Sequence, residues 1–453
     1  MNNVDVIVVG GGLSGLYSAI KLQESGVKTV VLEARDRVGG MTYSPYSEVL
    51  RQRIDLGGQW VGDLHKRMYG LIHRYKAPIV KQFTGGARVR IHGKQTFTGP
   101  MGTVPGLNAT EVEEQKSGLV TLERALESIP TDYWQGDIAY NFDSQTFSSW
   151  VDSKFHTQSV RGLLKRMTSS YYGAAANEIS ALDALNKFKA CGGPTFQAGV
   201  GEGAQEEHLV GAAYISERMA EEIGNVVLSA DVREIKWSDK RVEVRTSKGE
   251  WGARFLVCAM SPTMISQVQF YPVLPAIRRQ FHQRFPIGQY TKVALTYPKQ
   301  FWRDRQLSGN VICMDGSIGS VYDLGSESSD YPVLAALFGG VAGKGISQLS
   351  NDERKSRVLN IISQALGNDA AKPIDYQEQI WAEDAWAAGA SCSFTTPGAI
   401  TAIGYRVFAP TGPIYWAGTQ AARQFPGYME GALVAGEAAA LGVMQSASGG
   451  RQS

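Results

Sequence analysis

A cluster of glycines near the start of the chain has the spacing of a site that binds phosphate groups. Gly10, Gly12 and Gly15 stand within the run Gly-Gly-Gly-Leu-Ser-Gly, and Glu33 follows later. In such a pattern the first glycine allows a sharp turn, the second lets backbone approach a pyrophosphate, and the third lets a helix pack closely. A carboxylate at the position of Glu33 accepts hydrogen bonds from ribose hydroxyls. These residues predict dinucleotide binding, and a glycine-rich turn without a ligand leaves Glu33 unexplained.

The surrounding residues predict the elements that must position this site. The apolar run 6–9 predicts a strand, and the spacing of Leu16, Ala19, Ile20 and Leu22 predicts a helix that Gly26 ends. A second apolar run at 29–32 leads to Glu33. The order strand, tight turn, helix, strand is that of a mononucleotide-binding unit, whose helix N-terminus attracts phosphate.

The residues after Glu33 identify the dinucleotide by resemblance. The run Arg37-Val38-Gly39-Gly40 resembles the second phosphate-contacting motif of FAD proteins of the glutathione-reductase type, in the flavin monoamine oxidase family. A site for NAD needs no such motif. The family commonly has an arginine after the paired glycines, whereas this chain has Met41. One polar contact near the cofactor is therefore missing or comes from elsewhere.

Residues 54–61 resemble the family's Asp-x-Gly-Gly segment, whose backbone passes close to the flavin ring. The resemblance places Gly57 and Gly58 there, because a side chain would block the approach. The pair Gln59-Trp60 is the form associated with soluble amine oxidases that act on diamines or nicotine-like amines. The alternative for this segment is a plain loop.

Two further positions are assigned by the same resemblance. Val232 matches a position whose backbone binds the adenine. Lys292, in the apolar run 289–297, matches the lysine that holds a water near N5 of the flavin. A cation or a lysine–water pair beside the reduced flavin assists oxygen reduction and proton transfer. The alternative is a solvated lysine on an edge strand.

The stretch after Trp381 resembles the segment in which membrane-bound monoamine oxidases attach FAD to a cysteine that a tyrosine follows. Aligned from Trp381 without gaps, these two positions are Ala390 and Ser391, and Cys392 lies further along. We therefore expect non-covalent FAD. One wall of the usual aromatic cage is absent, or Phe394 or another residue supplies it.

The last signature covers residues 412–432 and is very similar to the closing motif of the family. A strand leads to Gly418 and Thr419, and a helix rich in small residues follows Tyr428 and Met429. The helix N-terminus stabilises negative charge on the reduced ring. Tyr428 matches the aromatic that stands over the substrate face of the flavin. The alternative for Tyr428 is a buried core tyrosine.

The resemblance gives a full set of site residues. The expected catalytic residues are Lys292 and Tyr428, and the expected substrate contacts are Tyr428, Trp60 and Phe394. The expected FAD contacts are Gly10, Gly12, Leu13, Ser14, Gly15, Glu33, Ala34, Arg35, Gly39, Gly40, Met41, Gly57, Gly58, Gln59, Trp60, Val232, Trp381, Gly418, Thr419, Tyr428 and Met429.

The resemblance runs along the whole chain and implies an α/β fold with an FAD-binding Rossmann-like domain of the glutathione-reductase type. An α+β substrate domain, an antiparallel sheet flanked by helices, is inserted into it. We expect FAD-binding segments at 1–78, 205–285 and 386–445, substrate-domain segments at 79–204 and 286–385, and a disordered tail at 446–453. Alternation around His92-Gly93 predicts a hairpin. Helices are expected at 110–129 and 146–172.

Composition limits the other function classes. The 453 residues are 43% hydrophobic and 19% charged, and the net charge of +2 is too small to indicate nucleic acid or an anionic membrane. We expect no signal peptide, and no apolar run approaches the roughly 20 residues that span a bilayer. The four scattered cysteines form no CxxC pair, so we expect no metal site and a reducing compartment. A soluble, cytoplasmic protein follows. The sequence does not give the oligomeric state, although homodimers are common in the family that the chain resembles.

The resemblance implies an FAD-dependent amine oxidase. Hydride moves from the carbon next to an amine nitrogen to flavin N5, giving an imine, and O₂ reoxidises the flavin to give H₂O₂. The first alternative is an oxidase on the same scaffold that acts on an amino acid, an amide or a biosynthetic intermediate. An amino acid oxidase would need an arginine for the carboxylate, and the sequence does not choose among several. The second alternative is a non-catalytic flavin-binding interaction protein.

Overall fold

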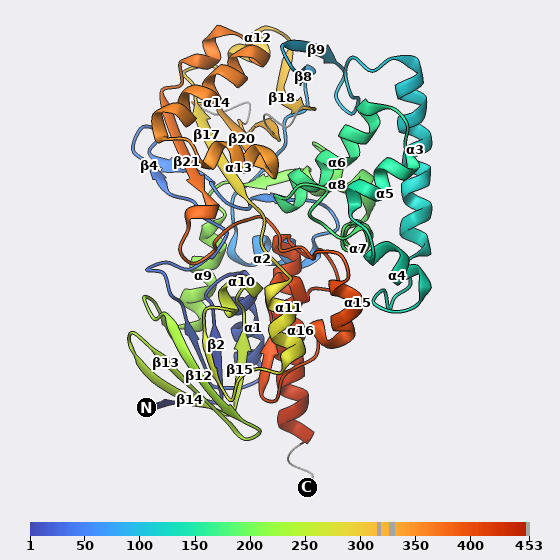
Figure 1. Ribbon diagram of the computed structural model, residues 1–453. Coiled ribbons are helices and arrows are strands. Elements are labelled where there is room, and N and C mark those ends of the chain that lie inside the picture. Colours follow the sequence, from blue (N-terminus) through green and yellow to red (C-terminus); the bar gives the residue numbers. More distant parts are fainter. Residues whose placement is uncertain (315–318, 326–330, 450–453) are drawn as a thin grey trace.

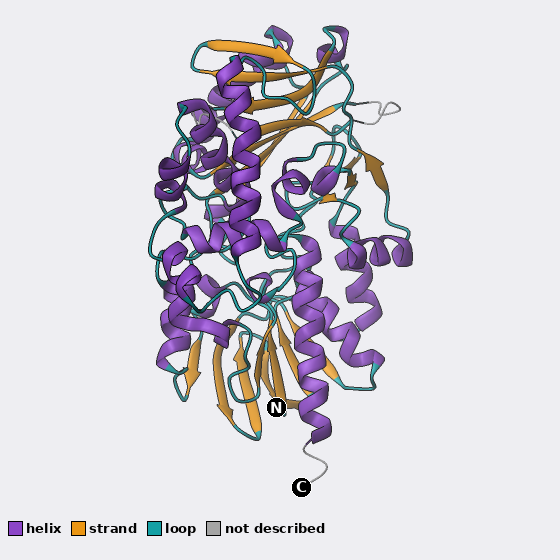
Figure 2. Cartoon of the chain, turned by 90° about the vertical axis from the view of Figure 1, so that its right-hand side faces the viewer, coloured by secondary structure: helices purple, strands orange, loops and turns teal. Residues whose placement is uncertain are grey.

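The computed structural model describes residues 1–314, 319–325 and 331–449. Its strands form two groups at opposite ends of the molecule, and both described chain ends lie toward the same end (Figure 1; Figure 2). Helices and loops lie between and around the two groups. The site is built where the two groups of strands face each other.

One group is centred on a parallel sheet with the strand order β11-β3-β2-β15-β22. Every residue of its two predicted strands is buried, as the continuous apolar runs require. Its strands come from three separated parts of the sequence: β2 (Val6–Val9), β3 (Thr29–Leu32), β11 (Val226–Val227), β15 (Phe255–Cys258) and β22 (Ile414–Trp416). They all lie within the expected FAD-binding segments, whose boundaries stay a prediction.

A second sheet covers the back of the parallel sheet. Its order is β1-β14-β13-β12-β16. Val242 and Trp251 from this sheet share a buried cluster with Ile7 and Leu32 of the parallel sheet. The strands are β1 (Asn2–Asn3), β12 (Val232–Ser238), β13 (Arg241–Thr246), β14 (Gly249–Ala253) and β16 (Gln269–Tyr271).

Helix α1 (Leu13–Glu24) lies on the other side of the parallel sheet and packs against α9 (Ala213–Ile223) and α16 (Met429–Gly449). Leu16, Leu433 and Ala440 are buried together there, with Met68 from α2 (Lys66–Tyr75). Because α16 continues through Gly449, the predicted disordered tail begins too early. Residues 446–449 are helical, and residues 450–453 lie outside the described residues.

The group at the other end is a large sheet with the order β21-β17-β20-β19-β18-β8-β9. All its neighbouring strands are antiparallel except β18 and β8, which are parallel. The expected hairpin is confirmed by β8 and β9. The strands are β8 (Ala87–His92), β9 (Gln95–Gly99), β17 (Tyr290–Thr296), β18 (Leu307–Cys313), β19 (Ser320–Asp323), β20 (Val333–Gly339) and β21 (Asp375–Ile380).

Alternation along these strands separates two faces of the large sheet. On β17, Val293 and Leu295 pack into the cluster beneath α12 (Phe301–Asp304), α13 (Val341–Ser347) and α14 (Asn351–Leu366). Tyr290 and Lys292 point to the opposite face, which lines the cavity described below. Because side chains alternate along the strand, Val293 and Leu295 lie in the core, whereas Tyr290 and Lys292 lie at the cavity.

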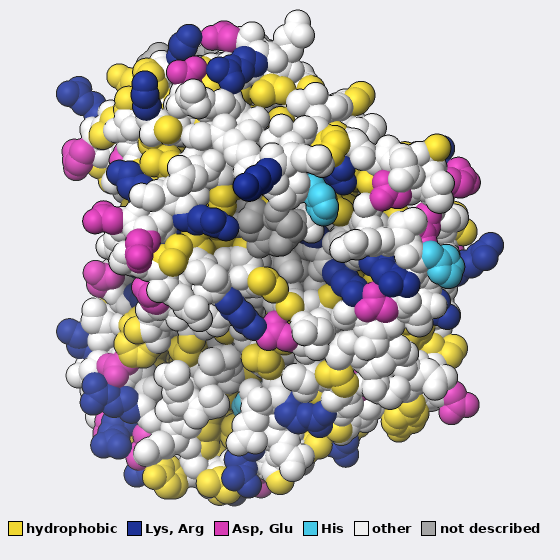
Figure 3. All heavy atoms as spheres, turned by 45° about the horizontal axis from the view of Figure 1, so that its top comes forward, with side chains coloured by type: hydrophobic (Ala, Val, Ile, Leu, Met, Phe, Trp, Pro, Cys, Tyr) yellow, Lys and Arg dark blue, Asp and Glu magenta, His cyan; other side chains and the backbone are white. Residues whose placement is uncertain are grey.

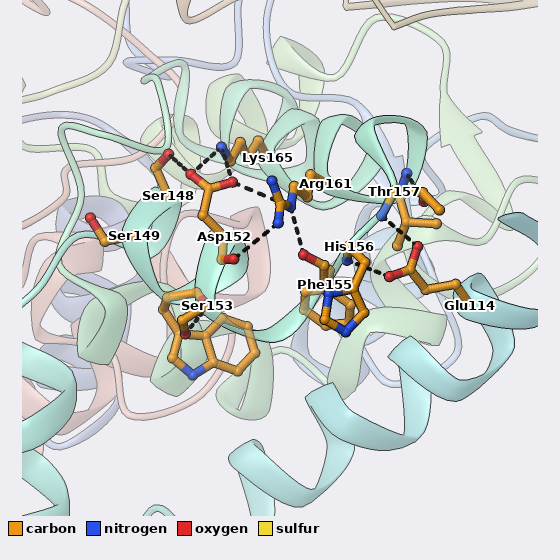
Figure 4. Close-up of polar contacts among 12 residues, drawn as sticks. Glu114, Ser148, Ser149, Asp152, Ser153, Phe155, His156, Thr157, Arg161 and Lys165 are labelled. Atoms are coloured by element: carbon orange, nitrogen blue, oxygen red, sulfur yellow. Dashed lines mark hydrogen bonds and ion pairs between the residues drawn. The ribbon is translucent and has the colours of Figure 1, made fainter.

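The predicted helix 146–172 is two helices, α5 (Phe147–Lys154) and α6 (Gln158–Tyr172). Glu114, from α3 (Ala109–Ser128), accepts hydrogen bonds from the backbone N–H groups of His156 and Thr157 at the break (Figure 4). Thr157 caps α6 through Val160 N. The Glu114 carboxylate, distant in sequence, therefore pairs with backbone N–H groups that would bond within the helix if it were continuous. The residues near the break do not reveal this partner.

The remaining elements connect these layers. The helices are α4 (Asp137–Asp143), α7 (Ala181–Ala190), α8 (Gly193–Ala198), α10 (Pro262–Ile265), α11 (Ala276–Gln283) and α15 (Ala399–Ile403). The short strands are β4 (Tyr46–Ser47), β5 (Gln52–Arg53), β6 (Trp60–Val61), β7 (Ile79–Lys81) and β10 (Glu207–Leu209).

On the face shown in Figure 3, lysine and arginine side chains are interspersed with aspartate and glutamate. This mixture agrees with the net charge of +2 and gives that face no extended basic surface. In the part of the chain that the structure describes, no helix combines the length and apolar character needed to cross a bilayer.

Candidate functional site

A cavity of about 1290 Å³ runs from the carboxyl ends of the parallel strands to the face of the large sheet. It is lined by every residue of the predicted site except Gly15 and Phe394. Residues far apart in sequence, such as Glu33, Val232, Lys292 and Tyr428, therefore meet around one space. We call its end at the parallel sheet the cradle and its end at the large sheet the chamber.

The cradle begins at the N-terminus of α1. Gly12 is the N-cap residue of this helix, and no side chain caps it, so the first-turn N–H groups are left for a ligand. A Cβ on Gly12 would meet only Gly40 Cα at 3.8 Å, and Gly12 and Gly39 form a parallel bridge. The two predicted phosphate motifs thus lie side by side. Their open backbone fits the pyrophosphate of FAD.

Gly15 has the packing role that the sequence predicts, although it does not line the cavity. A Cβ at this position would lie 2.0 Å from Gly10 O. Any side chain would therefore push α1 away from the end of β2. Gly10 has φ +105°, which favours glycine at the turn itself.

Glu33 is buried at the end of β3, where its carboxylate accepts hydrogen bonds from Gly11 N at 2.6 Å and Arg35 N at 2.9 Å. Such a carboxylate has lone pairs left for ribose hydroxyls. Arg35 also pairs with Asp384 at 2.5 Å, which ties the loop after β3 to a segment far along the chain. Val232 lines the same end of the cavity, as its assignment to the adenine requires.

Lys292 lies where the cradle meets the chamber. It is buried on β17, and its Nζ donates to Gly57 O at 3.0 Å and to Gln59 Oε1. The same Nζ lies 4.8 Å from the centroid of the Trp60 ring. The structure therefore brings the predicted lysine together with the predicted flavin-facing segment 57–60. A solvated edge-strand lysine does not describe this position, because β17 lies between β20 and β21.

Burial lowers the pKa of Lys292 to about 7, and the negative charge of Asp55 opposes that shift. Asp55 is itself buried, and its carboxylate accepts from Ser44 Oγ, Gly211 N and Ala212 N. Burial raises the pKa of Asp55, and these contacts oppose the rise. Near neutral pH the Lys292 amine therefore gains or loses a proton easily, which suits proton transfer.

Tyr428 immediately precedes α16 and lines the cavity with Gly427 and Met429. Its ring centroid lies 5.4 Å from that of Tyr171, at an angle of 42° between the rings. The first turn of α16, through Met429 and Ala432, thus lies at the cavity beside an aromatic wall. This arrangement places a helix N-terminus where negative charge is stabilised.

Phe394 does not supply the missing wall. It is buried among helices with Phe188 and Ile400 and is not among the cavity-lining residues, so the predicted substrate contact is wrong. Helix α6 instead brings Tyr171 next to Tyr428. Tyr171 could not be predicted from the residues around Cys392, because α6 is more than two hundred positions away in the sequence.

The described lining of the cavity contains none of the four cysteines, and all four are free and buried. Ala390 occupies the position that matches the attachment cysteine, and it lines the cavity. Cys392 Sγ lies against Ser393 O instead. These positions fit FAD that is held without a covalent bond.

Met41 lines the cavity and packs against the apolar cluster of Trp381, Ala387 and Ala390. Arg37 does not replace the missing polar contact. Its guanidinium donates to Gly40 O at 3.1 Å and lies 4.4 Å from the Tyr43 ring centroid, and it is not part of the lining. The cavity wall at Met41 is therefore apolar.

The chamber also contains residues that the sequence did not single out. They lie on the cavity face of the large sheet or on α6, and they are Arg88, Arg166, Tyr171, Tyr290, Asn310 and Tyr322. The available signal was alternation: polar or aromatic side chains at every second position of otherwise apolar strands. Alternation alone does not say which face of a strand meets a ligand.

The comparisons with known proteins agree with this geometry. The family profile described as "Flavin containing amine oxidoreductase" matches residues 13–444. The flavin-containing amine oxidase of Danio rerio is 33% identical over 452 residues, which cover 98% of this chain and 86% of that protein. The flavin-containing amine oxidase B of Homo sapiens is 32% identical over 459 residues, covering 98% and 87%.

Solved structures show the same likeness. Cyclohexylamine oxidase from Brevibacterium oxydans IH-35A aligns with a TM-score of 0.93 and 29% identity, covering 98% of this chain and 99% of that one. Putrescine oxidase bound to putrescine aligns with a TM-score of 0.93 and 25% identity over the same shares. Because the family match extends over most of the sequence and the cradle fits the cofactor, the chain belongs to the family of flavin-containing amine oxidases and binds FAD.

Proposed function

We propose that this FAD-dependent amine oxidase oxidises its substrate in the chamber, between Lys292 and Tyr428. The observation that carries the proposal is that cradle and chamber are one continuous cavity. An amine in the chamber therefore reaches the cofactor without crossing a wall of protein. When bound, FAD supplies the oxidant, accepting hydride from the carbon next to nitrogen to give an imine and passing the electrons to O₂ to give H₂O₂.

The residues of the chamber have separate roles in this proposal. Lys292 holds a proton at Nζ near neutral pH, and its contacts with Gly57 O and Gln59 Oε1 fix that nitrogen in place. Tyr428, Tyr171 and Trp60 form aromatic walls that exclude water from the apolar part of an amine. No general base is needed, because a neutral amine gives up hydride directly.

The test is an absorbance spectrum followed by anaerobic titration of the purified holoenzyme with amines. We expect yellow colour that acid precipitation releases into the supernatant, as non-covalent FAD requires. The panel includes cyclohexylamine and putrescine, which the solved relatives are named for. We expect at least one amine to bleach the flavin and air to restore it with peroxide. A flavin that no amine reduces would overturn the proposal.

The pH dependence gives a second criterion. Only the neutral amine donates hydride, so kcat/KM should rise with pH through the pKa of the amine substrate. For two amines with different pKa values, the pH profiles of kcat/KM should be displaced from each other by the difference between those pKa values. A profile that does not follow the amine would assign the titration to the protein instead.

We also propose that the chain works in the cytoplasm as a homodimer. The four free, buried cysteines support a reducing compartment. Light scattering coupled to gel filtration tests the dimer, and a mass of one chain would overturn it. Fluorescence microscopy of a tagged chain in its own cells tests the location.

A further inference from the structure

The floor of the chamber is a row of residues that face each other across the large sheet. Lys292 on β17 lies opposite Leu337 on β20, Leu337 opposite Ser320 on β19, and Ser320 opposite Ile312 on β18. All four side chains line the cavity. Neighbouring strands lie about 4.8 Å apart, so Ser320 is roughly 10 Å from Lys292 along this row.

An arginine from the opposite wall reaches this row at Ser320. Arg166 on α6 donates through Nη2 to Ser320 Oγ at 2.7 Å, and through Nε and Nη2 to Gly319 O at 3.3 and 3.2 Å. Its Nη1 group has no hydrogen bond within the described residues, and Arg166 forms no ion pair with them. Among the described residues, no acceptor competes with a ligand for the two N–H donors of Nη1.

A second arginine lies further along the floor. Arg88 on β8 donates through Nε to Asn310 Oδ1 at 2.6 Å and through Nη1 to Thr103 O at 3.1 Å. It too forms no ion pair with any described residue. Burial lowers the pKa of both arginines, and the positive charge of Arg166 adds to the effect on Arg88.

The described lining offers these two cations no buried carboxylate in the chamber. Glu33 and Asp231 belong to the cradle, and Glu202 is exposed on the loop after α8. Two arginines that repel each other in a partly dehydrated space cost stability unless an anion offsets them. A second ammonium group in the same space would add to the repulsion.

We propose that the substrate is an amine whose far end carries a carboxylate, which Arg166 binds and the positive charge of Arg88 attracts. The proposal rests on the proposed function and names its substrate class. With the amine end beside Lys292, the carboxylate lies roughly 10 Å away, two strand spacings along the floor. The site therefore selects ω-amino acids of medium length over diamines. It also rejects α-amino acids, whose carboxylate is attached to the reacting carbon.

The first experiment compares four substrates with the same chain length on the holoenzyme: octylamine, octane diamine, ω-aminooctanoate and α-aminooctanoate. A charge-assisted hydrogen bond in such a place changes affinity by roughly tenfold to a hundredfold. We expect kcat/KM for ω-aminooctanoate to exceed that for octylamine by at least about tenfold, with the diamine below both. Equal or lower values for ω-aminooctanoate would overturn the proposal.

The second experiment uses variants and a binding measurement. Arg166→Gln should lower the ratio of kcat/KM for ω-aminooctanoate to that for octylamine by about tenfold, and Arg88→Gln, which removes a more distant charge, should lower it by a smaller factor. Arg161→Gln is the matched control. Arg161 lies on the same helix, donates to Phe155 O and pairs with Asp152 outside the cavity (Figure 4). The ratio of kcat/KM for ω-aminooctanoate to that for octylamine should therefore be unchanged in Arg161→Gln.

Binding of octanoate, followed by perturbation of the flavin spectrum, gives a reading that does not depend on turnover. Wild type and Arg161→Gln should bind octanoate alike, and Arg166→Gln should bind it about tenfold more weakly. Equal octanoate affinity in Arg166→Gln and wild type contradicts the carboxylate site.

If octylamine reduces the flavin and ω-aminooctanoate has no advantage, only this inference fails. If no amine reduces the flavin, the proposed function fails.

Discussion

Lys292 shows how burial changes the chemistry of a single side chain. In water its ammonium would be charged throughout the physiological range, but on β17 its pKa is lowered to about 7. The carbonyl of Gly57 and the amide of Gln59 accept hydrogen bonds from its Nζ and orient it. The residue therefore combines a fixed position with a proton that leaves and returns near neutral pH.

Replacing Lys292 with methionine keeps most of the side-chain volume and removes the proton. General acid–base groups contribute about 100-fold or more to the rates they assist. We expect Lys292→Met to slow reoxidation of the reduced flavin by about that factor, measured by stopped-flow mixing with air-saturated buffer. In wild type the rate should fall as pH rises through about 7, because the charged form of Lys292 is lost.

Lys344→Met serves as the control for this substitution. Lys344 lies on α13, pairs with Glu178 and is not part of the cavity lining. Its removal should leave the reoxidation rate and the pH profile unchanged. A pH profile that persists in Lys292→Met would assign the proton to another group.

At the scale of elements, the cradle depends on how closely α1 and α16 approach each other. A Cβ on Gly436 of α16 would lie 2.3 Å from Ser14 O, at the first turn of α1. Ser14 Oγ also donates to Ala417 O, which joins the same turn to the end of β22. Helix α1 is therefore held by contacts that leave no room for a methyl group.

Gly436→Ala should displace the first turn of α1 and weaken the cradle. Overpacking of this kind costs about 1–3 kcal/mol. We expect a lower midpoint of thermal unfolding and a loss of FAD on dilution, read from flavin fluorescence. Retention of FAD equal to wild type would show that the two helices separate without harm.

The control for this change is Gly70→Ala on α2, where an added Cβ meets nothing within 4 Å. Alanine in a helix interior is favoured over glycine by roughly 0.8–1 kcal/mol. The midpoint of thermal unfolding should therefore stay the same or rise in Gly70→Ala, which separates the effect of crowding from that of any glycine replacement.

At the scale of the whole molecule, three buried histidines link stability to pH. Burial lowers the pKa of His65 and His208 to about 4 and that of His282 to about 3. Each is neutral in the folded protein, whereas in the unfolded chain it gains a proton below about 6.5. The contribution of the neutral histidines to the free energy of unfolding is complete above about pH 6.5 and is lost as the pH falls toward about 4.

We expect the thermal midpoint of the holoenzyme to fall steadily between about pH 6.5 and pH 4. A shift of 6.5 to about 4 corresponds to on the order of 3 kcal/mol for one histidine. His282→Phe should reduce the fall, while His92→Asn, at an exposed position of β8, should not. A midpoint that is constant over this range would contradict the neutral state of these residues.

The sequence determined the cradle, because the features that build it are local. Apolar runs become buried strands through the periodicity of their own side chains, and glycine spacing decides where backbone comes close to a ligand. Gly10, Gly12, Gly39 and Glu33, which the sequence assigns to the cofactor, all line the cavity. The resemblance further along the chain located Lys292 and Tyr428, and the family comparisons confirmed its source.

Only the tertiary structure decided which side chains share the chamber. The carboxylate of Glu114 arrives from another helix to divide α5 from α6, and α6 then presents Tyr171 in place of Phe394 and brings Arg166 over Ser320. These meetings depend on the packing of elements far apart in sequence. Periodicity predicts which side chains share one face of a helix or strand, but not which element packs against that face. The cofactor could therefore be predicted from the sequence, whereas the residues at the far end of the substrate site could not.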